Sequence, residues 1–248
     1  MPLFQFSVLS PCEGLNHAVF TRHGGVSRPP FHTLNTAFGN GDDPGRVREN
    51  LRRIKDILHA RALAFMDQVH GKEILVLKGK ATRAPLPEPL QGDALITDGE
   101  GIALMVKQAD CQAVLLYDPS RRVIANVHCG WRGNRQNILG AVVETMRKEF
   151  GCNPAEILAG IGPSLGPCCA EFVTHEEIFP KEFRPFMVRE NYFNLWEISR
   201  FQLIEAGLEE NHIEVAGLCT RCRTDLFFSY RGEGTTGRFA TLIMLKDL

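Results

Sequence analysis

Three side chains in this sequence have the types and spacing needed to hold a metal ion. His70 lies in the segment DQVHG, Cys111 ends the segment QADC, and His128 opens the segment HCGWRG. Zinc prefers imidazole and thiolate ligands in a tetrahedron. These residues lie 41 and 17 positions apart, so each would come from a different strand end. Three widely spaced protein ligands are typical of a catalytic zinc site with one open position. The sequence therefore predicts a zinc centre here.

The neighbours of these residues have predicted roles of their own. Successive side chains of a strand point to opposite faces, so Cys129 should face away from the metal. The same alternation turns Asp110 away from Cys111, where it could hydrogen-bond a ligand or donate a proton. Any single His or Cys is more often a core or solvated residue than a ligand. The glycines beside His70 and around the Trp-Arg pair favour the metal site, because they permit close backbone approach.

Composition excludes several function classes. The 248 residues are 44% hydrophobic and 23% charged, with a formal net charge of -1. This balance gives no electrostatic footprint for nucleic acid or for an anionic membrane. No apolar run approaches the roughly 20 residues of a spanning helix, and the N-terminus lacks signal-peptide features. We expect a cytoplasmic protein whose eight cysteines are thiols or ligands rather than disulfides.

The elements that position these residues read as one α/β mixed (α+β) domain over residues 1–248, with mixed sheets flanked by helices. Short apolar runs predict strands at 18–20, 63–66, 73–77, 93–97, 102–106, 113–117, 123–127, 157–161, 215–218 and 240–245. Helical spacing predicts helices at 44–60, 134–150 and 195–209, and a weaker one at 174–179. Residues 78–91 are rich in proline and charge and read as a surface loop.

Several segments together resemble the family of multicopper polyphenol oxidase (laccase)-like proteins, also called YfiH/YlmD-like. They occur in family order and cover nearly the whole chain. The matching pieces are TRHGGVS (21–27), GDDP (41–44), QVHG (68–71), ADC (109–111), HCGWRG (128–133), GPSLG (162–166), FFSYR (227–231) and TGR (236–238).

The resemblance implies a zinc site at His70, Cys111 and His128. It implies phosphorolysis of adenosine, inosine, guanosine and methylthioadenosine, together with deamination of adenosine. It also implies mixed sheets flanked by helices, distantly like some cysteine-hydrolase-like toxins. The chain departs from the family at Cys129, where a small residue is usual, and in the segment after Gly133. These departures bear on substrate preference more than on the metal.

Phosphorolysis needs an anion site, because phosphate attacks C1′ of the ribose. Arg22, in its glycine-rich turn, is the first choice for phosphate contact, with help from His23. The amides of Asn35 and Gln68 suit a base or ribose. Each arginine could equally be a solvated surface charge, and each amide a turn residue. Two further cations and a helix start complete the predicted sites: Arg231, Arg238 and the helix beginning at Asn134.

Four other readings remain open. Copper could replace zinc, but eight histidines are fewer than the centres of true multicopper oxidases require. Cys111 could be the nucleophile of a cysteine hydrolase, with His128 or His70 as its base. The same site could hydrolyse amides in peptidoglycan precursors, or the chain could be a non-enzymatic binding module.

The remaining cysteines suggest no second site. The pair in C219-x2-C222 has no second C-x2-C partner, so plain thiols are expected. Cys168 and Cys169 are adjacent in the chain and cannot easily bridge each other, so we assign them no role.

Overall fold

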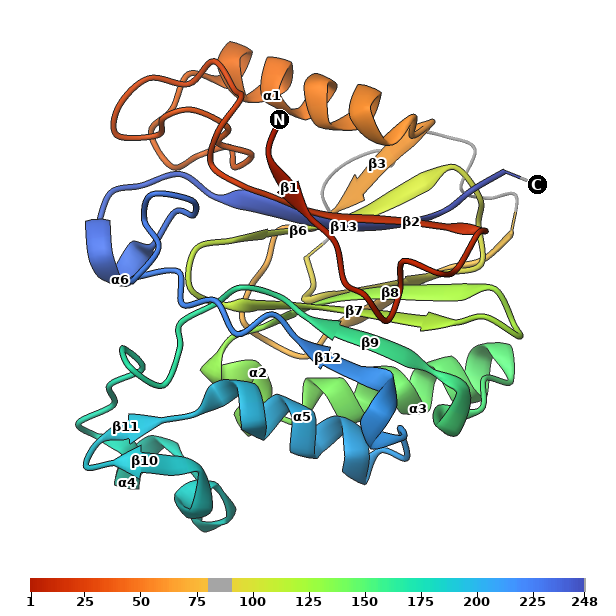
Figure 1. Ribbon diagram of the computed structural model, residues 1–248, viewed down its shortest axis with the longest axis vertical. Coiled ribbons are helices and arrows are strands. Elements are labelled where there is room, and N and C mark those ends of the chain that lie inside the picture. The colour runs from red at the N-terminus through yellow and green to blue at the C-terminus, as the bar shows by residue number, and fades with distance from the viewer. Residues whose placement is uncertain (80–90, 248) are drawn as a thin grey trace.

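Four layers make up the protein in a computed structural model that describes residues 1–79 and 91–247. Two β-sheets face each other in the middle, and helices cover both outer faces (Figure 1). One sheet has the strand order β1 (Leu3–Phe4), β2 (Leu15–Phe20), β13 (Phe239–Leu245), β6 (Ile102–Gln108) and β3 (Ala62–Phe65). The other has the order β12 (Ile213–Val215), β9 (Leu158–Ile161), β7 (Gln112–Asp118), β8 (Val123–Cys129), β5 (Ala94–Thr97) and β4 (Ile74–Leu77).

Both sheets are mixed, and both of their faces are buried. Most neighbours are antiparallel, but β3 pairs with β6, β4 with β5, and β12 with β9 in parallel. Alternate residues serve different layers, as in β6, where Leu104 packs between the sheets and Met105 packs outward. This explains why the strands read as continuous apolar runs. The predicted α/β mixed fold is confirmed.

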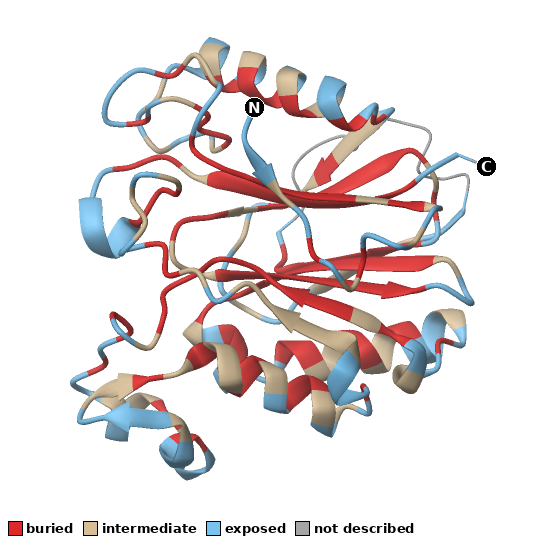
Figure 2. Cartoon of the chain, in the orientation of Figure 1, coloured by how far each residue is buried: buried red, intermediate tan, exposed pale blue. Residues whose placement is uncertain are grey.

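Helices close the two outer faces (Figure 1). The helix α1 (Pro44–Leu58) covers the first sheet and buries Val47, Ile54 and Leu58 against it. The helices α2 (Trp131–Arg135), α3 (Ile138–Phe150) and α5 (Leu195–Glu205) lie under the second sheet. Burial follows this layering, because the helix sides that face the sheets are buried and their outer sides are exposed (Figure 2).

A small lobe extends beyond the second sheet (Figure 1). It contains α4 (His175–Ile178) and the antiparallel pair β10 (Met187–Arg189) and β11 (Tyr192–Phe193). Its apolar centre is aromatic, with Phe172, Phe179 and Phe193 in edge contacts. The other short elements with both ends in the described part of the chain are α6 (Tyr230–Glu233) and the 3-10 turns at Pro154–Glu156, Lys181–Phe186 and Glu210–His212.

The structure corrects some predicted boundaries. The helix expected over 134–150 is two helices, because Asn137 has a left-handed backbone and its side chain caps α3 at the N–H of Gly140. The helix expected to reach residue 209 ends at Glu205, and the strand expected at 215–218 lies at 213–215. The loop expected over 78–91 lies mostly outside the described residues. Within residues 1–79 and 91–247, no helix is long and apolar enough to span a bilayer.

Candidate metal centre and its cavity

The strand pairing of the second sheet brings the three predicted ligands together. Cys111 lies where the chain crosses from β6 in one sheet to β7 in the other. In the antiparallel β7–β8 pair, Gln112 lies opposite Cys129, which puts Cys111 beside the end of β8 and therefore near His128. His70 reaches the same point from the loop between β3 and β4.

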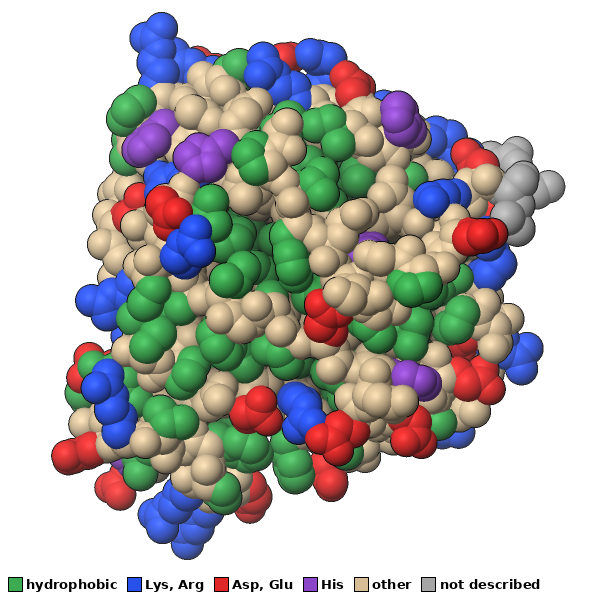
Figure 3. Space-filling model, viewed as in Figure 1, with side chains coloured by type: hydrophobic (Ala, Val, Ile, Leu, Met, Phe, Trp, Pro, Cys, Tyr) green, Lys and Arg blue, Asp and Glu red, His purple; other side chains and the backbone are tan. Residues whose placement is uncertain are grey.

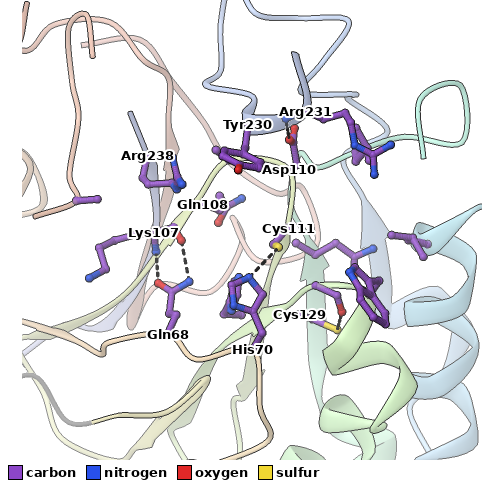
Figure 4. Close-up of a pocket in the computed structure, with 18 of the residues that line it drawn as sticks. Gln68, His70, Lys107, Gln108, Asp110, Cys111, Cys129, Tyr230, Arg231 and Arg238 are labelled. Carbon is purple, nitrogen blue, oxygen red and sulfur yellow. Dashed lines mark hydrogen bonds between the residues drawn. The ribbon is translucent and has the colours of Figure 1, made fainter. Parts of the chain in front are cut away.

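The three side chains converge on one point. Their ligand atoms all lie within 4.8 Å of one another. Cys111 Sγ is 3.9 Å from His70 Nε2 (Figure 4), and the two imidazole rings are 4.9 Å apart between centroids. His128 is buried, Cys111 is half-buried and His70 is exposed. Because exposure increases from His128 to His70, one side of the three-residue group is accessible from outside.

A buried carboxylate that sequence reasoning missed supports two of these residues. Asp93 is 0% exposed, and its Oδ1 lies 2.8 Å from His128 Nδ1. Its two oxygens also accept the backbone N–H groups of His70 and Gly71, at 3.0 Å and 2.7 Å. The carboxylate therefore fixes the left-handed turn at His70 and leaves His128 Nε2 free for a metal.

The electrostatics of the group favour a thiolate. Burial alone would raise the pKa of Cys111, but the imidazoles of His128 and His70 outweigh it and lower the pKa to about 6. Burial alone would lower the pKa of His128, but the Cys111 thiolate and Asp93 outweigh it and raise the pKa to about 9. Near pH 7 and without metal, the two groups form a thiolate–imidazolium pair.

This pairing predicts the pH dependence of alkylation in metal-stripped protein. The rate at Cys111 should rise with pH, reach half its maximum near pH 6 and be flat above pH 7, because only the thiolate reacts. Cys12 is the internal control, since burial raises its pKa and its rate should still be rising at pH 9. Peptide mass spectrometry separates the two sites. A Cys111 profile that parallels that of Cys12 would contradict the pairing.

The donor set fits a zinc ion. Tetrahedral zinc with one sulfur and one nitrogen ligand places them about 3.6 Å apart, close to the observed 3.9 Å. Gly130 makes room for this approach, because a Cβ there would lie 2.8 Å from Cys111 Sγ and 3.6 Å from His70 Cδ2. The thiolate excludes the hard cations magnesium and calcium, but it accepts copper as well as zinc.

A cavity of about 750 Å³ lies over the three residues, within the usual range for small-molecule sites. Figure 4 shows Tyr230, Arg231 and Arg238 around its mouth, and His70 and Cys111 near its centre. Its lining is Ala37, Asp67, Gln68, His70, Lys107, Gln108, Ala109, Asp110, Cys111, Gln112, His128, Cys129, Gly130, Trp131, Leu165, Phe172, Leu195, Tyr230, Arg231 and Arg238.

The cavity has three cationic side chains in its walls. Arg238 donates from Nη1 to two backbone carbonyls, those of Thr236 and Gly237, and burial lowers its pKa. Arg231 donates to the Glu171 carbonyl. Burial also lowers the pKa of Lys107. Sequence reasoning missed Lys107, because a single lysine at a strand end carries no spacing signal.

Apolar and aromatic side chains also line the cavity, and two of them lie against these cations: Phe172 beside Arg231 and Tyr230 beside Arg238. Trp131, Phe172 and Leu165 line the cavity, and Tyr230 stands at the mouth with 63% of its surface exposed. Trp131 belongs to the HCGWRG segment and Tyr230 to the FFSYR segment. Both segments were identified from the sequence, but the lining of a cavity by these two aromatic side chains was not predicted. On the face seen in Figure 3, charged side chains of both signs are interspersed around hydrophobic ones.

Two predicted site residues line the cavity, but their polar atoms already hydrogen-bond to other groups of the protein. Gln68 exchanges two hydrogen bonds with Lys107, from Nε2 to the carbonyl at 2.8 Å and to Oε1 from the N–H at 2.9 Å. Asp110 accepts from Thr220 Oγ1, Ser229 Oγ and the N–H of Arg231, at 2.7, 2.7 and 2.6 Å. None of these partners is a predicted metal ligand. Asp110 therefore anchors the start of α6, which carries Arg231, and the carboxylate on His128 is that of Asp93.

Three other predicted substrate-binding residues lie outside the cavity lining. Arg22 is buried, forms an ion pair with Glu233 at 2.9 Å and stacks on Phe228, so it ties the N-terminal segment to the chain's end. His23 is exposed and contacts the Asp225 carbonyl. Asn35 is fully buried and binds neighbouring loop groups, including the N–H of Arg238 at 2.9 Å. These positions hold loops together rather than face a ligand.

Two further expectations concern the segment after His128. The predicted anion site at Asn134 is absent there, because α2 already begins at Trp131 and the Asn134 amide binds Ser199 and Gln202. Cys129 packs in the apolar core on the helix side, so it faces away from the metal group as predicted. Burial raises the pKa of its thiol.

The four cysteines to which no role was assigned also meet. The sulfur atoms of Cys168, Cys169, Cys219 and Cys222 all lie within 4.8 Å of one another. Sequence reasoning sought a second C-x2-C partner and overlooked the adjacent pair.

Residues 16–246 match the family model described as multi-copper polyphenol oxidoreductase laccase. The chain is 32% identical to a protein of *Geobacillus stearothermophilus* named purine nucleoside phosphorylase YlmD, over 96% of this chain and 92% of the relative. It is 33% identical to purine nucleoside phosphorylase YfiH of *Escherichia coli*, over 94% and 95% of the two chains.

Solved structures give the same result. The crystal structure of the *Bacillus licheniformis* hypothetical protein YfiH superposes with a TM-score of 0.86 and 33% identity, over 94% of this chain and 93% of that one. The crystal structure of *Geobacillus stearothermophilus* YlmD also gives 0.86, with 32% identity and 96% and 94% coverage. The distant likeness to cysteine-hydrolase-like toxins stays a prediction.

Proposed function

Because the chain belongs to the family of multi-copper polyphenol oxidoreductase laccases, also called the YfiH family, we propose that it is a zinc-dependent purine nucleoside phosphorylase. Its proposed substrates are phosphate and adenosine, inosine, guanosine or methylthioadenosine, and it also deaminates adenosine. The names of the relatives at 32 and 33% identity support this proposal. The observation that carries it is a cavity with metal-ligand side chains near its centre and with both cationic and aromatic side chains in its walls.

The proposed reaction exchanges a base for phosphate. An oxygen of phosphate forms a bond to C1′ of the ribose while the bond from C1′ to N9 of the purine breaks. The bonding electrons leave with the purine, which takes up a proton. Zinc, when bound to His70, Cys111 and His128, supplies Lewis-acid polarisation of a substrate group or water. The chain's own residues must therefore hold the phosphate and orient the nucleoside.

The cations of the cavity replace Arg22 as the proposed phosphate contacts. Arg238 and Arg231 line the cavity and each presents a guanidinium group that can hydrogen-bond phosphate with charge assistance. Lys107 adds a third positive charge. Asp110 contributes indirectly, because it accepts the backbone N–H of Arg231 and so fixes where that residue starts.

The aromatic side chains of the cavity form the proposed purine site. Phe172, Trp131 and Tyr230 offer ring faces and edges to a flat heterocycle. Gln108 also lines the cavity, but its Oε1 is shielded from the cavity space, so a ligand reaches this acceptor only if the side chain rotates.

Product analysis tests the proposal. Purified protein given adenosine with phosphate should release adenine and ribose 1-phosphate, in amounts that follow the phosphate concentration. Without phosphate, the proposed deaminase activity should give inosine and ammonia. Chromatography resolves all of these products. Metal-loaded protein that turns over no nucleoside under either condition would contradict the substrate assignment and leave the amide-hydrolysis reading.

The phosphate site gives a quantitative prediction. Arg238→Gln should raise KM for phosphate roughly 10- to 100-fold, because a hydrogen bond to a charged group contributes about 1.5–3 kcal/mol. KM for adenosine should change far less. Arg28→Gln is the matched control, since Arg28 is exposed and lies outside the cavity lining. Initial rates over a phosphate series measure both variants, and an unchanged KM in Arg238→Gln would contradict the assignment.

One observation favours a second candidate function. Without metal, Cys111, His128 and Asp93 have the arrangement of a cysteine hydrolase, with a nucleophile, a base and a carboxylate that orients the base. In that reading, Cys111 Sγ attacks a carbonyl carbon and His128 donates the proton that the leaving group needs. Metal content separates the two functions, because a thiolate bound to zinc is not a free nucleophile.

The alternative hypothesis, that the protein is a copper-dependent polyphenol oxidase, has less support than the zinc-dependent phosphorylase. Among residues 1–79 and 91–247, the groups of three or more metal-ligating side chains are His70 with Cys111 and His128, and the four-cysteine group. One histidine-containing group offers a mononuclear site rather than the several copper centres of a multicopper oxidase.

A further inference from the structure

Four cysteines from two loops gather beside the cavity, outside the proposed reaction centre. Cys168 and Cys169 follow β9, and Cys219 and Cys222 follow β12. All four sulfur atoms lie within 4.8 Å of one another. Cys222 Sγ is 3.6 Å from both Cys168 Sγ and Cys169 Sγ. Four thiolates around one zinc ion lie about 3.8 Å apart, because each Zn–S bond is about 2.3 Å long.

The fold, rather than chance packing, brings these loops together. The strands β9 and β12 are parallel neighbours, so their carboxyl ends meet at one edge of the sheet. Beyond that edge the pairing continues at Ser164, which accepts from the N–H of Thr220 at 3.0 Å and donates its own N–H to the Leu218 carbonyl at 3.1 Å. Cys219 therefore has a fixed register against the loop that carries Cys168 and Cys169.

The absence of a side chain at Gly166 lets its loop pack closely against Cys219. A Cβ on Gly166 would lie 3.0 Å from the Cβ of Cys219 and 2.8 Å from the Trp196 ring. The N–H of Gly166 points to Cys219 Sγ at 3.3 Å. A backbone N–H that donates to sulfur stabilises a thiolate over a thiol. The loop is thus built to receive Cys219 at close range.

Neither ordinary thiols nor one disulfide explain this arrangement. Structural free cysteines are usually buried, but Cys168 and Cys222 are exposed. A disulfide joins two sulfurs, whereas Cys222 Sγ is equidistant from two partners and Cys219 completes a compact group of four. A compact group of four sulfurs, rather than one close pair, is what a single tetrahedral ion requires. A four-iron cluster would hold its cysteines farther apart than 4.8 Å.

We propose that Cys168, Cys169, Cys219 and Cys222 bind one zinc ion as a closed structural site. Four thiolates satisfy the ion completely, so this site has no open position for a substrate. One cation moderates the net negative charge, because Arg189 donates to the Cys168 carbonyl at 3.2 Å.

The site would brace the cavity. Thr220, between two of the cysteines, donates to Asp110 Oδ1 at 2.7 Å, and the N–H of Leu165 donates to the Asp110 carbonyl at 2.8 Å. Both loops of the tetrathiolate site are therefore tied to the segment that carries Cys111. Leu165 and Phe172, on either side of the cysteine pair, line the cavity wall. The ion acts as a fixed support for that wall.

Metal analysis of the full-length protein tests this inference separately from the proposed function. Zinc per chain is measured by elemental mass spectrometry after gel filtration, in the wild type, Cys111→Ala, the double variant Cys168→Ser/Cys222→Ser and the control Cys12→Ser. We expect about two zinc ions in the wild type and in the control, and about one in each of the other proteins. If the reaction centre bound no zinc, the wild type and Cys111→Ala would both hold about one, and only the double variant would lose it.

X-ray absorption on Cys111→Ala gives an answer even if the double variant fails to fold. Its zinc should be surrounded by four sulfur atoms at about 2.3 Å and by no nitrogen. Protein that lacks zinc after loss of Cys111, or whose remaining zinc has nitrogen or oxygen neighbours, would overturn the inference. Unreduced protein with a disulfide between these cysteines would overturn it as well.

Discussion

Cys111→Ala should lose the metal of the reaction centre and slow phosphorolysis by more than roughly 100-fold. Loss of a direct ligand should exceed the 10- to 100-fold effects typical of residues that only support ligands. The thiolate is also the sole anionic ligand of the three, and its lowered pKa of about 6 means that it meets the ion already deprotonated. Metal content and initial rates of adenine release measure both effects in one preparation.

Cys129→Ala is the matched control for this variant. Cys129 follows the ligand His128 directly, but its thiol packs on the helix side of the sheet. Its loss should cost roughly 1 kcal/mol of stability from a small core void and leave metal binding and rate within about twofold. If Cys111→Ala kept both its metal and its rate, or if Cys129→Ala lost them, the ligand assignment would be wrong.

Asp93→Asn should have the next largest effect. The wild-type carboxylate accepts from His128 Nδ1 and from the N–H groups of His70 and Gly71. An asparagine turns one of these acceptors into a donor that faces another donor. We expect metal affinity and rate to fall by roughly 10- to 100-fold. The free energy of unfolding should fall by about 1–3 kcal/mol, because a buried polar group is left unpaired.

The pH dependence of this variant follows from the carboxyl pKa. Burial raises the pKa of Asp93, but the hydrogen bonds from His128 and Gly71 outweigh it, so the folded pKa lies below the ordinary 3.8. The wild-type advantage is therefore present above about pH 4 and disappears as the pH falls through the folded pKa. Asp98→Asn, an exposed carboxylate just past the other end of β5, should change little. Equal metal affinity in wild type and Asp93→Asn would rule out the proposed support.

The three central residues could be predicted because their types suit a metal and because their segments resemble the YfiH/YlmD-like family. Their types and spacing alone would not have separated them from the other histidines and cysteines. The continuous apolar runs predicted strands buried on both faces, and the helical spacing of Val47, Leu51 and Ile54 predicted α1. The apolar patterns of these strands and of α1 are local in the sequence, so they can be recognised without an alignment or a structure.

Residues that act through long-range packing could not be predicted. Asp93 gives no local sign that it faces His128, since that contact depends on the pairing of β5 with β8. Arg22 reads as a free cation in its glycine-rich turn, but its partner Glu233 is 211 residues away. The four-cysteine group was missed for the same reason, because β9 and β12 become neighbours only through the sheet topology. Asn137 could not be read as a helix break, because asparagine also occurs inside helices.

The fold and the proposed chemistry meet at the edges of the two facing sheets. Cys111 lies on the crossover between them, and Asp110 connects that crossover to both loops of the four-cysteine group, because its carbonyl accepts from the N–H of Leu165 and its carboxylate accepts from Thr220 Oγ1. Of the three proposed metal ligands, His128 lies in β8, whereas His70 and Cys111 lie in connections next to strands. Tyr230 and Arg231 begin α6, and Asp110 fixes this helix through the N–H of Arg231.

The most direct test of this account is the rate of adenine release from adenosine and phosphate as the metal is removed by a chelator and zinc is returned. The account predicts that the rate falls with the metal of the His70, Cys111 and His128 centre and recovers when zinc is restored. Stripped protein that keeps its full rate, and that loses it when Cys111 is alkylated, would contradict the account and identify Cys111 as a nucleophile.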